Sequence, residues 1–324
     1  MIVPQRNTPL LTAQGIKVHF PIKSGFLRRV TGSVKAVDGI DLTVNPGETL
    51  AIVGESGSGK STLGRALLRL GPMTEGTLRW DSTMDLLAMD ADVLRNFRRN
   101  MQMVFQDPHA SLNPRHTAGF LLAEPLRIHA LASGKELDDR VDALLKSVGL
   151  SPTDKSKYPH QFSGGQKQRL AIARALAVEP RLVVADEPVS ALDMSVQAQV
   201  LGLLEELKQN LGLTYIFISH DLGVVRRVSD RVLVMYLGHV VEEADTHSLF
   251  QNPVHPYTQA LIKASTAGSG ETNPPLTGEI PSPSNPPPGC PFQTRCPKVM
   301  EKCRREYPSW TPRDGGRVAC WLNP

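Results

Sequence analysis

The sequence predicts an α/β fold in which a mainly parallel sheet is covered by helices, and two observations lead to this prediction. Three continuous apolar runs bounded by turn residues span 48–53, 181–185 and 213–218. Runs of this kind are typical of strands that are buried on both faces of a parallel sheet. A segment with helical spacing of apolar residues follows each run, and this alternation is typical of α/β proteins.

The remaining elements follow from shorter patterns. Two β-rich runs, 15–20 and 34–44, are separated by a basic loop that contains glycine, and residues 101–105 are expected to form a further strand. Apolar residues have helical spacing over 60–70 and over about 116–178. We therefore expect β structure in the N-terminal part and a helical region in the middle of the chain.

Composition divides the chain near Gly268. Eight prolines lie between Pro274 and Pro291, too many for a helix or a central strand. We interpret this stretch as an extended linker. The expected organisation is a main domain at 1–265 with a helical subdomain at about 107–178, a Pro-rich linker at 266–289 and a four-cysteine tail at 290–324.

The bulk composition excludes several classes of protein. A hydrophobic fraction of 40% is enough for a buried core and argues against global disorder. No apolar run reaches the roughly 18–20 residues that span a bilayer, and the first residues lack the regions of a signal peptide, so we expect a cytoplasmic chain. The net charge of +4 suits an anionic ligand or an anionic membrane face, although many ordinary soluble proteins carry as much.

The strand at 48–53 ends at a glycine loop with the pattern G-x-x-x-x-G-K-S. Its glycines let backbone N–H groups point at phosphate oxygens, and the helix that follows adds partial positive charge. Lys60 would neutralise the β- and γ-phosphates, and the Ser61 hydroxyl would bind Mg²⁺. The residues expected to hold a nucleotide here are Gly54, Glu55, Ser56, Gly57, Ser58, Gly59, Lys60, Ser61 and Thr62.

Two further motifs fit the same chemistry. Asp186 and Glu187 end a buried strand, where Asp186 could hold the water shell of Mg²⁺ and Glu187 could polarise the attacking water. The motif Ser163-Gly-Gly-Gln166 precedes a helical run, so its backbone amides form a second anion site. A chain with one nucleotide but two phosphate-binding ends predicts a head-to-tail dimer, in which each chain closes the nucleotide site of the other.

These motifs, in this order, resemble those of the ABC ATPase family. The resemblance implies a P-loop NTPase core with an N-terminal antiparallel β subdomain, a helical signature subdomain and a small cysteine-bearing C-terminal extension. Phe162 stands where many relatives have Leu, which is an exchange of one apolar residue for another. The residues implied to be catalytic are Lys60, Gln106, Glu187 and His220, and those implied to bind Mg²⁺ are Ser61, Gln106 and Asp186.

The resemblance also implies nucleotide contacts outside the phosphate loop. Phe20 is the implied adenine-stacking residue, with Phe26 as the alternative. The signature motif and the D-loop, which would bind the nucleotide of the partner, supply Ser163, Gly164, Gly165, Gln166 and Asp193.

Residues 105–115, 158–163 and 278–290, together with the tail, are similar to oligopeptide/dipeptide permease ATPases. This implies an ATPase subunit that energises import of di- or oligopeptides, bound peripherally to the cytoplasmic face of the bacterial inner membrane. The implied partners are a second ATPase subunit, two integral-membrane permeases and, indirectly, an extracytoplasmic binding protein, with no nucleic acid. Because the relatives include nickel and glutathione importers, the cargo stays open.

Two other classes of protein are alternatives. Soluble ABC-type ATPases of DNA repair or translation usually carry two cassettes or a long coiled-coil insertion, whereas the stretch between Gln106 and Ser163 has room only for a small helical subdomain. A non-catalytic regulatory nucleotide binder is disfavoured by the presence of both Glu187 and His220.

The tail holds every cysteine of the chain, namely Cys290, Cys296, Cys303 and Cys320. Thiolates bind zinc or iron–sulfur clusters, but the spacing C-x5-C-x6-C-x16-C lacks the short pair of a zinc knuckle. Similarity to the peptide-importer ATPases implies a [4Fe–4S] cluster with a structural or redox-sensing role, and zinc or free thiols remain alternatives. We expect the tail to fold around its metal independently of the main domain, so that replacing Cys303 leaves nucleotide binding nearly intact.

Overall fold

The computed structural model describes residues 8–24, 29–266 and 278–323. The chain divides into two compact units. The first unit joins Met1–Leu87 to Phe217–Pro324, and the second unit is Ala88–Ile216. The first unit is thus assembled from the two ends of the chain, whereas the second is one continuous segment.

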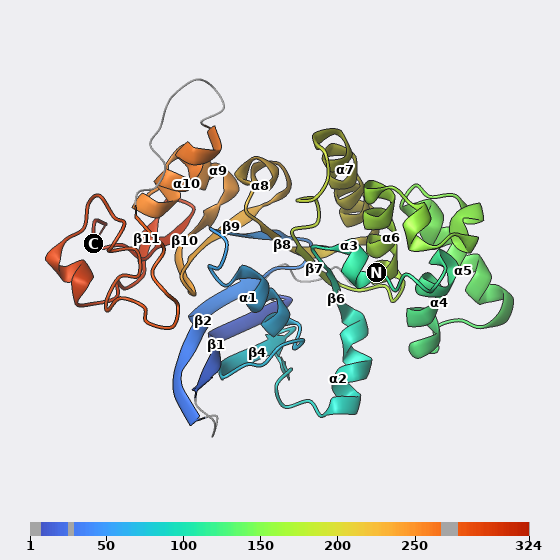
Figure 1. Ribbon diagram of the computed structural model, residues 1–324, viewed down its shortest axis with the longest axis horizontal. Helices are drawn as coiled ribbons and strands as arrows, with labels where there is room; N and C mark the ends of the chain where they lie inside the picture. The colour runs from blue at the N-terminus through green and yellow to red at the C-terminus, as the bar shows by residue number, and fades with distance from the viewer. Residues whose placement is uncertain (1–7, 25–28, 267–277, 324) are drawn as a thin grey trace. The chain divides into compact units, whose positions relative to one another are not determined.

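The first unit contains an antiparallel sheet with the strand order β2–β1–β4–β5 and a mixed sheet with the order β11–β12–β10–β9–β3 (Figure 1). In the mixed sheet β3 and β9 are parallel, and the other neighbours are antiparallel. The strands are β1 (Leu11–Ser24), β2 (Arg29–Val44), β3 (Thr49–Val53), β4 (Glu75–Trp80), β5 (Met84–Asp85), β9 (Arg231–Tyr236), β10 (His239–Asp245), β11 (Thr311–Arg313) and β12 (Gly316–Val318). The helices are α1 (Lys60–Leu67), α8 (Leu222–Val228), α9 (Thr246–Gln251), α10 (Pro256–Thr266) and the 3-10 segment η5 (Glu301–Arg304).

The second unit is mainly helical around a short parallel strand pair, β6 and β7. Strand β8 (Thr214–Ser219) carries the chain out of it into the first unit. The strands are β6 (Met101–Val104) and β7 (Leu182–Asp186), and the helices are α2 (Ala91–Phe97), η1 (Arg98–Asn100), α3 (Pro108–Ser111), α4 (Ala118–Ile128), α5 (Gly134–Ser147), η2 (Pro152–Ser156), η3 (Pro159–Gln161), α6 (Gly164–Leu176) and α7 (Met194–Leu211).

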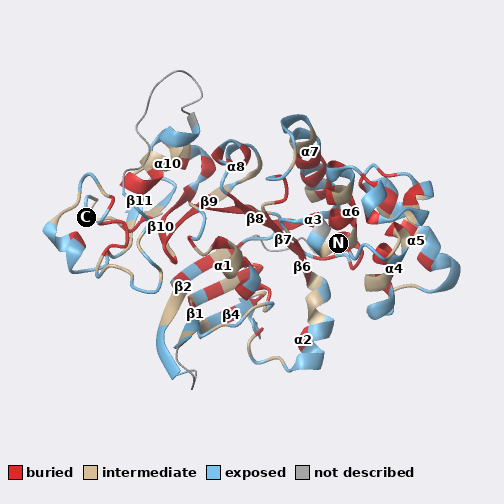
Figure 2. Cartoon of the chain, in the orientation of Figure 1, coloured by how far each residue is buried: buried red, intermediate tan, exposed pale blue. Residues whose placement is uncertain are grey.

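The three apolar runs of the sequence are confirmed as strands β3, β7 and β8, in which every residue is buried. Figure 2 shows that β9 of the first unit is buried as well, except at its first residue, Arg231. By contrast β2 buries alternate side chains near its end, among them Ile40, Leu42 and Val44, because one face of an antiparallel sheet points away from the core.

The expected helical region at about 116–178 is not continuous. A turn after Ile128 separates α4 from α5, and the 3-10 segments η2 and η3 lie between α5 and α6, each beginning at a proline, Pro152 or Pro159. Proline suits the first position of a helix, where its missing N–H would have no partner, although α4 also contains an internal proline, Pro125. The region is therefore helical, as the pattern predicts, and consists of several helices.

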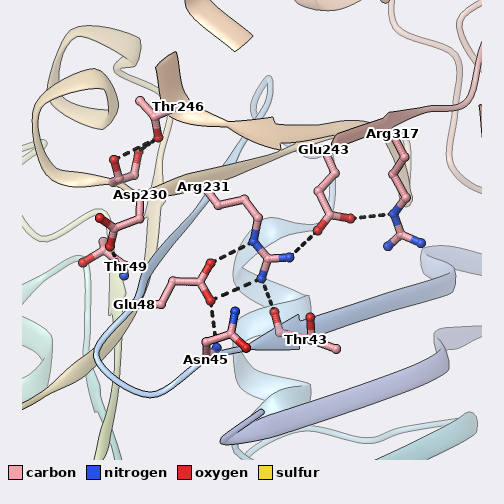
Figure 3. Close-up of polar contacts among 10 residues, drawn as sticks. Thr43, Asn45, Glu48, Thr49, Asp230, Arg231, Glu243, Thr246 and Arg317 are labelled. Atoms are coloured by element: carbon pink, nitrogen blue, oxygen red, sulfur yellow. Dashed lines mark hydrogen bonds and ion pairs between the residues drawn. The ribbon is translucent and has the colours of Figure 1, made fainter. Parts of the chain in front are cut away.

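A network of partly buried polar contacts joins β12 of the C-terminal tail to β10, β9 and the start of β3 (Figure 3). Arg317 of β12 donates to Glu243 of β10 at 2.7 Å, and Glu243 accepts from Arg231 of β9 at 2.5 Å. Arg231 also donates to Glu48 at 2.8 Å, directly before β3, and to the carbonyl oxygen of Thr43. The two carboxylates of this network, Glu48 and Glu243, each pair with a guanidinium group. These pairs offset the free-energy cost of removing the carboxylates from water.

The expectation of an independently folding tail is wrong. Strand β12 hydrogen-bonds to β10 with Val318 opposite Glu242, so the tail is part of the mixed sheet. Arg313 pairs with the fully buried Glu242. Phe292 is fully buried with its ring centroid 5.2 Å from that of Tyr236. Packing against the sheet, and not the cysteines alone, therefore holds the tail.

Candidate functional site

The glycine loop between β3 and α1 is shaped by two glycines that no other residue could replace. Gly54 has φ 152° and Gly59 has φ 103°, and a Cβ at either position would lie 2.2 or 2.1 Å from a backbone carbonyl oxygen. Positive φ is accessible to glycine at little steric cost. The loop therefore passes close to neighbouring backbone along a path that only glycine can follow at these two positions.

Two polar side chains of the loop are buried beneath it. Lys60, which is 5% exposed, donates from Nζ to the carbonyl oxygens of Gly54 and Glu55 at 2.8 and 2.9 Å. Ser58 is 4% exposed, and its hydroxyl has no hydrogen-bond partner among the described residues. A buried hydroxyl without a partner is costly, and a phosphate oxygen would satisfy it. Ser61 and Thr62 follow in the first turn of α1.

In the second unit, the parallel pairing of β6 and β7 brings two predicted residues together. Val104 pairs with Ala185, so the segments that follow the two strands emerge at the same edge. There Gln106 Nε2 donates to Glu187 Oε2 at 2.8 Å. Asp186, the last residue of β7, is 1% exposed.

Glu187 has an uncommon backbone conformation. Its φ is 47°, in the left-handed region that residues with a Cβ rarely adopt. Its carbonyl oxygen accepts from the N–H and the hydroxyl of Ser190 at 3.3 and 3.1 Å, and these bonds hold the turn. Strain of this kind is concentrated at functional sites.

The second predicted anion site is the N-terminus of α6. Ser163 caps this helix: its hydroxyl accepts from the Gln166 N–H at 3.3 Å, while its own N–H donates to Gln166 Oε1 at 3.0 Å. Ser163, Gly164 and Gln166 are exposed. A Cβ on Gly165 would lie 2.3 Å from a methyl carbon of Val196 in α7, so only glycine allows this contact.

Asp193 caps α7 by accepting from the Val196 N–H at 3.0 Å and from the Ser195 hydroxyl at 2.8 Å. The backbone hydrogen bond from Val196, followed by the side-chain hydrogen bond from Ser195, lowers the pKa of the Asp193 carboxyl. The D-loop residue is therefore an exposed anion at neutral pH. Because both caps lie in the second unit, the close contact of Gly165 with Val196 fixes the signature and the D-loop as neighbours.

Two other predicted residues lie in the first unit. Phe20 in β1 is 40% exposed, which leaves part of its ring accessible for stacking. His220 directly follows β8 and is exposed, and Asp221 begins α8 by accepting from the Gly223 N–H at 2.8 Å. The alternative aromatic, Phe26, falls outside the described residues.

The four cysteines of the tail are unpaired by disulfides and line one cavity. Cys290 and Cys303 are buried, and the Cys290 N–H donates to the carbonyl oxygen of Cys303 at 2.8 Å. Burial raises the pKa of the Cys290 thiol to about 12. Burial likewise raises the pKa of the Cys296 and Cys320 thiols. Among residues 8–24, 29–266 and 278–323, no three His, Cys, Asp or Glu side chains are arranged to hold a single metal ion.

Comparison with known proteins identifies the family of the chain. A family model described as ABC transporter matches residues 37–190, and one described as oligopeptide/dipeptide transporter, C-terminal region, matches residues 241–303. The chain is 50% identical over 320 residues to the oligopeptide transport ATP-binding protein AppF of Bacillus subtilis, covering 97% of each chain. The chain belongs to the ABC transporter ATP-binding family.

Other members of the ABC family match as well. The oligopeptide transport ATP-binding protein OppF of Salmonella typhimurium is 50% identical over 315 residues, covering 95% of this chain and 94% of its own length. A dimeric ATP-binding cassette solved in a post-hydrolysis state with ADP and Pi is 32% identical, with a TM-score of 0.65. That match covers 73% of this chain and 98% of the cassette.

The chain is therefore an ABC ATPase, an enzyme that hydrolyses ATP, and the predicted P-loop α/β fold is confirmed. In the described part of the chain, every helix is too short or too polar to cross a bilayer.

The sequence did not reveal two contacts of the glycine loop. Glu55 pairs with Arg295 of the tail at 2.6 Å, and its N–H donates to the Tyr257 hydroxyl at 2.8 Å. The only signal in the sequence was an acid inside a loop expected to bind an anion, because Arg295 belongs to no motif.

Proposed function

We propose that this ABC ATPase powers the import of dipeptides or oligopeptides across the bacterial cytoplasmic membrane. The observation that carries the proposal is identity of about half the residues, over nearly the full length, to oligopeptide transport ATP-binding proteins. The match includes the C-terminal region that is characteristic of oligopeptide/dipeptide transporters. Import of another small solute, such as nickel or glutathione, is the alternative.

We propose that the loop Gly54–Thr62 binds the phosphates of ATP, with the adenine stacked on Phe20. Lys60 would exchange its two carbonyl partners for phosphate oxygens. The hydroxyl, amide and carboxylate oxygens of Ser61, Gln106 and Asp186 are a donor set that suits Mg²⁺, a hard cation that prefers oxygen ligands. Once bound, the ion would neutralise charge on the β- and γ-phosphates.

Glu187 is the proposed base for hydrolysis. Its carboxylate would accept a hydrogen bond from the attacking water and orient it toward the γ-phosphate. The contact with Gln106 at 2.8 Å supports this role, because it holds the carboxylate beside a proposed Mg²⁺ ligand. His220, exposed at the end of β8, would donate to the γ-phosphate and so report its presence.

Two chains would close head-to-tail around the nucleotides. Ser163, Gly164, Gly165 and Gln166 of one chain would face the γ-phosphate in its partner, and Asp193 would lie at the same interface. The exposed start of α6 supports this arrangement, since it offers amides and the positive end of a 13-residue helix to an anion outside the chain. The dimeric cassette among the solved structures supports it too.

The proposed partners are a second ATPase subunit, two membrane-embedded permeases and, through them, an extracytoplasmic binding protein. The subunit would be held at the cytoplasmic face of the membrane by the permeases. Residues 105–115 are the proposed contact. Arg174 of α6 donates to the carbonyl oxygen of Ser111 at 2.6 Å, so a shift of this segment reaches the signature helix directly.

The proposal is tested with the assembled transporter in lipid vesicles together with its binding protein. We expect dipeptides or oligopeptides to stimulate ATP hydrolysis and to accumulate inside, while nickel and glutathione do neither. Arg115→Ala, in the exposed part of the 105–115 segment, should lower transport more than hydrolysis. Stimulation by nickel or glutathione alone would assign the other cargo, and purification without any permease would contradict a role in transport.

We further propose that the tail binds a [4Fe–4S] cluster through Cys290, Cys296, Cys303 and Cys320. The donor set fits, because four thiols line one cavity and a cluster holds its thiolates farther apart than a single ion does. The cavity has a volume of only about 10 Å³, so the thiols must move apart on loading. The cluster would supply four metal–thiolate bonds that staple the tail.

Iron loading of the tail can be measured directly. Protein purified without oxygen should be brown and contain about four irons per chain, and Cys303→Ser should lose most of the iron. Loading should weaken as the pH falls, because the raised thiol pKa values mean that binding must displace protons. Stoichiometric zinc without iron would mean that the tail holds a zinc centre and not a cluster. If neither metal is found, the four thiols are free.

A further inference from the structure

The C-terminal tail contacts the phosphate loop through a two-bond ion pair. Arg295 donates from Nη1 and Nη2 to the two carboxylate oxygens of Glu55 at 2.6 and 3.0 Å. The Arg295 side chain is 4% exposed and that of Glu55 is 25% exposed. A bidentate pair with one partner buried is stronger and more directional than an exposed surface pair.

Glu55 is also held through its main chain. Its N–H donates to the Tyr257 hydroxyl at 2.8 Å, and its carbonyl oxygen accepts from Lys60 at 2.9 Å. The position of Glu55 therefore bears on both the path of the loop and the resting place of Lys60. If Glu55 were displaced, Lys60, which would bind the phosphates, would be displaced with it.

The pair matters electrostatically because ATP is an anion. A carboxylate inside a phosphate-binding loop repels an incoming triphosphate unless a cation neutralises it. Arg295 contacts the Glu55 carboxylate itself, with both of its terminal nitrogens. Arg295 can therefore cancel the one negative side chain of the loop.

The fold of the tail places Arg295. The residue lies between Cys290 and Cys296, and its N–H donates to the carbonyl oxygen of Phe292 at 3.0 Å. The Cys290 N–H donates to the Cys303 carbonyl oxygen at 2.8 Å. Arg295 thus sits in a short turn whose ends are fixed by the cysteine-bearing segment.

We infer that Arg295 is a positioning residue for the phosphate loop, and that through its pair with Glu55 the tail sets the affinity of the chain for ATP. This inference rests on the proposed assignment of Gly54–Thr62 as the nucleotide site. It replaces the expectation that changes in the tail leave nucleotide binding untouched.

The test measures the Kd for ATP of the purified full-length chain. Arg295→Met should raise the Kd about tenfold, the order expected for losing a charge-assisted hydrogen bond. Glu55→Gln added to Arg295→Met should recover most of the affinity, because it removes the unpaired charge. A purely structural role for Arg295 predicts no such recovery. In the assembled transporter, Arg295→Met should raise the KM for ATP more than it lowers kcat.

Two variants make the result decisive. Arg313→Met is the matched control, since the Arg313 side chain is equally buried in the tail but pairs with Glu242 of β10 and not with a residue of the loop. The Kd of this control should stay within about twofold of the wild type. Lys60→Ala checks the site itself. Normal binding by Lys60→Ala would overturn the nucleotide site and the inference with it. Two outcomes would overturn the inference but leave the nucleotide site in place. In the first, Lys60→Ala loses affinity for ATP while Arg295→Met binds ATP normally. In the second, Arg313→Met loses as much affinity for ATP as Arg295→Met does.

The role of the tail has its own measurement. Cys303→Ser should weaken ATP binding in the wild-type background and add little when Arg295 is already Met, because both changes act through the same contact. Equal effects in the two backgrounds would show that the tail does not act through Arg295.

Discussion

Glu187→Gln should lower the rate of ATP hydrolysis by roughly 10²- to 10⁴-fold, the contribution typical of a positioned general base. The amide has nearly the shape of the carboxylate and keeps an oxygen that can accept from Gln106, so the local structure and ATP binding should persist. What is lost is the negative charge that orients the attacking water. Single-turnover hydrolysis and ATP binding, measured on the same preparation, separate the two effects.

The chain offers a matched control for this substitution. Glu179 also lies in the second unit and also has a left-handed backbone, with φ 55°. Glu179→Gln therefore repeats both the loss of charge and the unusual conformation, away from the proposed site. We expect it to hydrolyse ATP at close to the wild-type rate. Wild-type turnover in Glu187→Gln would remove Glu187 from the mechanism.

Ser163→Ala should abolish most hydrolysis, by about 10²-fold or more, the usual effect of removing a donor from charge developing in a transition state. In the head-to-tail arrangement this loss falls on the nucleotide bound by the partner ATPase. Trapping ADP with vanadate and a photoreactive nucleotide would show which chain is labelled. Label should vanish from the partner and remain on this chain.

A helix cap elsewhere controls for stability. Thr117 caps α4 through an N–H to hydroxyl contact of 3.3 Å, the same length as the contact from Gln166 to Ser163. Removing either cap costs about 1 kcal/mol, so Thr117→Ala and Ser163→Ala should lower thermal stability alike. Only Ser163→Ala should affect hydrolysis. If label disappears from this chain instead, Ser163 acts on its own nucleotide and the head-to-tail model is wrong.

Local patterns predicted much of the fold and of the site. The strand before Gly54, the loop and the first turn of α1 are consecutive residues, so one window of sequence contains the whole phosphate loop. The same holds for the capping box of Ser163 and Gln166, which lie three residues apart. Parallel strands share an edge, which is why Gln106 and Glu187 meet although they are far apart in the chain.

Contacts across long separations left no such signal. Arg295 and Glu55 are 240 residues apart, and nothing periodic or compositional links them. The position of the tail was missed for a related reason. Its strands β11 and β12 have three residues each, too few for an alternating pattern, and the prolines before them suggested separation where the fold has sheet pairing. The break between α5 and α6 could have been found, since Pro152 and Pro159 mark it.

The division of the chain has a consequence for its synthesis. The second unit is one continuous segment, so it can fold during translation before the residues that follow Ile216 have been made, as domains generally do. The first unit also needs strands from the other side of that segment. Arg231 and Glu243 are made before Arg317, which lies 74 residues after Glu243 and shares it with Arg231. Until β12 has been made, a nascent mixed sheet keeps its β10 edge unpaired, and such edges invite aggregation. Strand β12 thus decides when the subunit becomes safe to assemble.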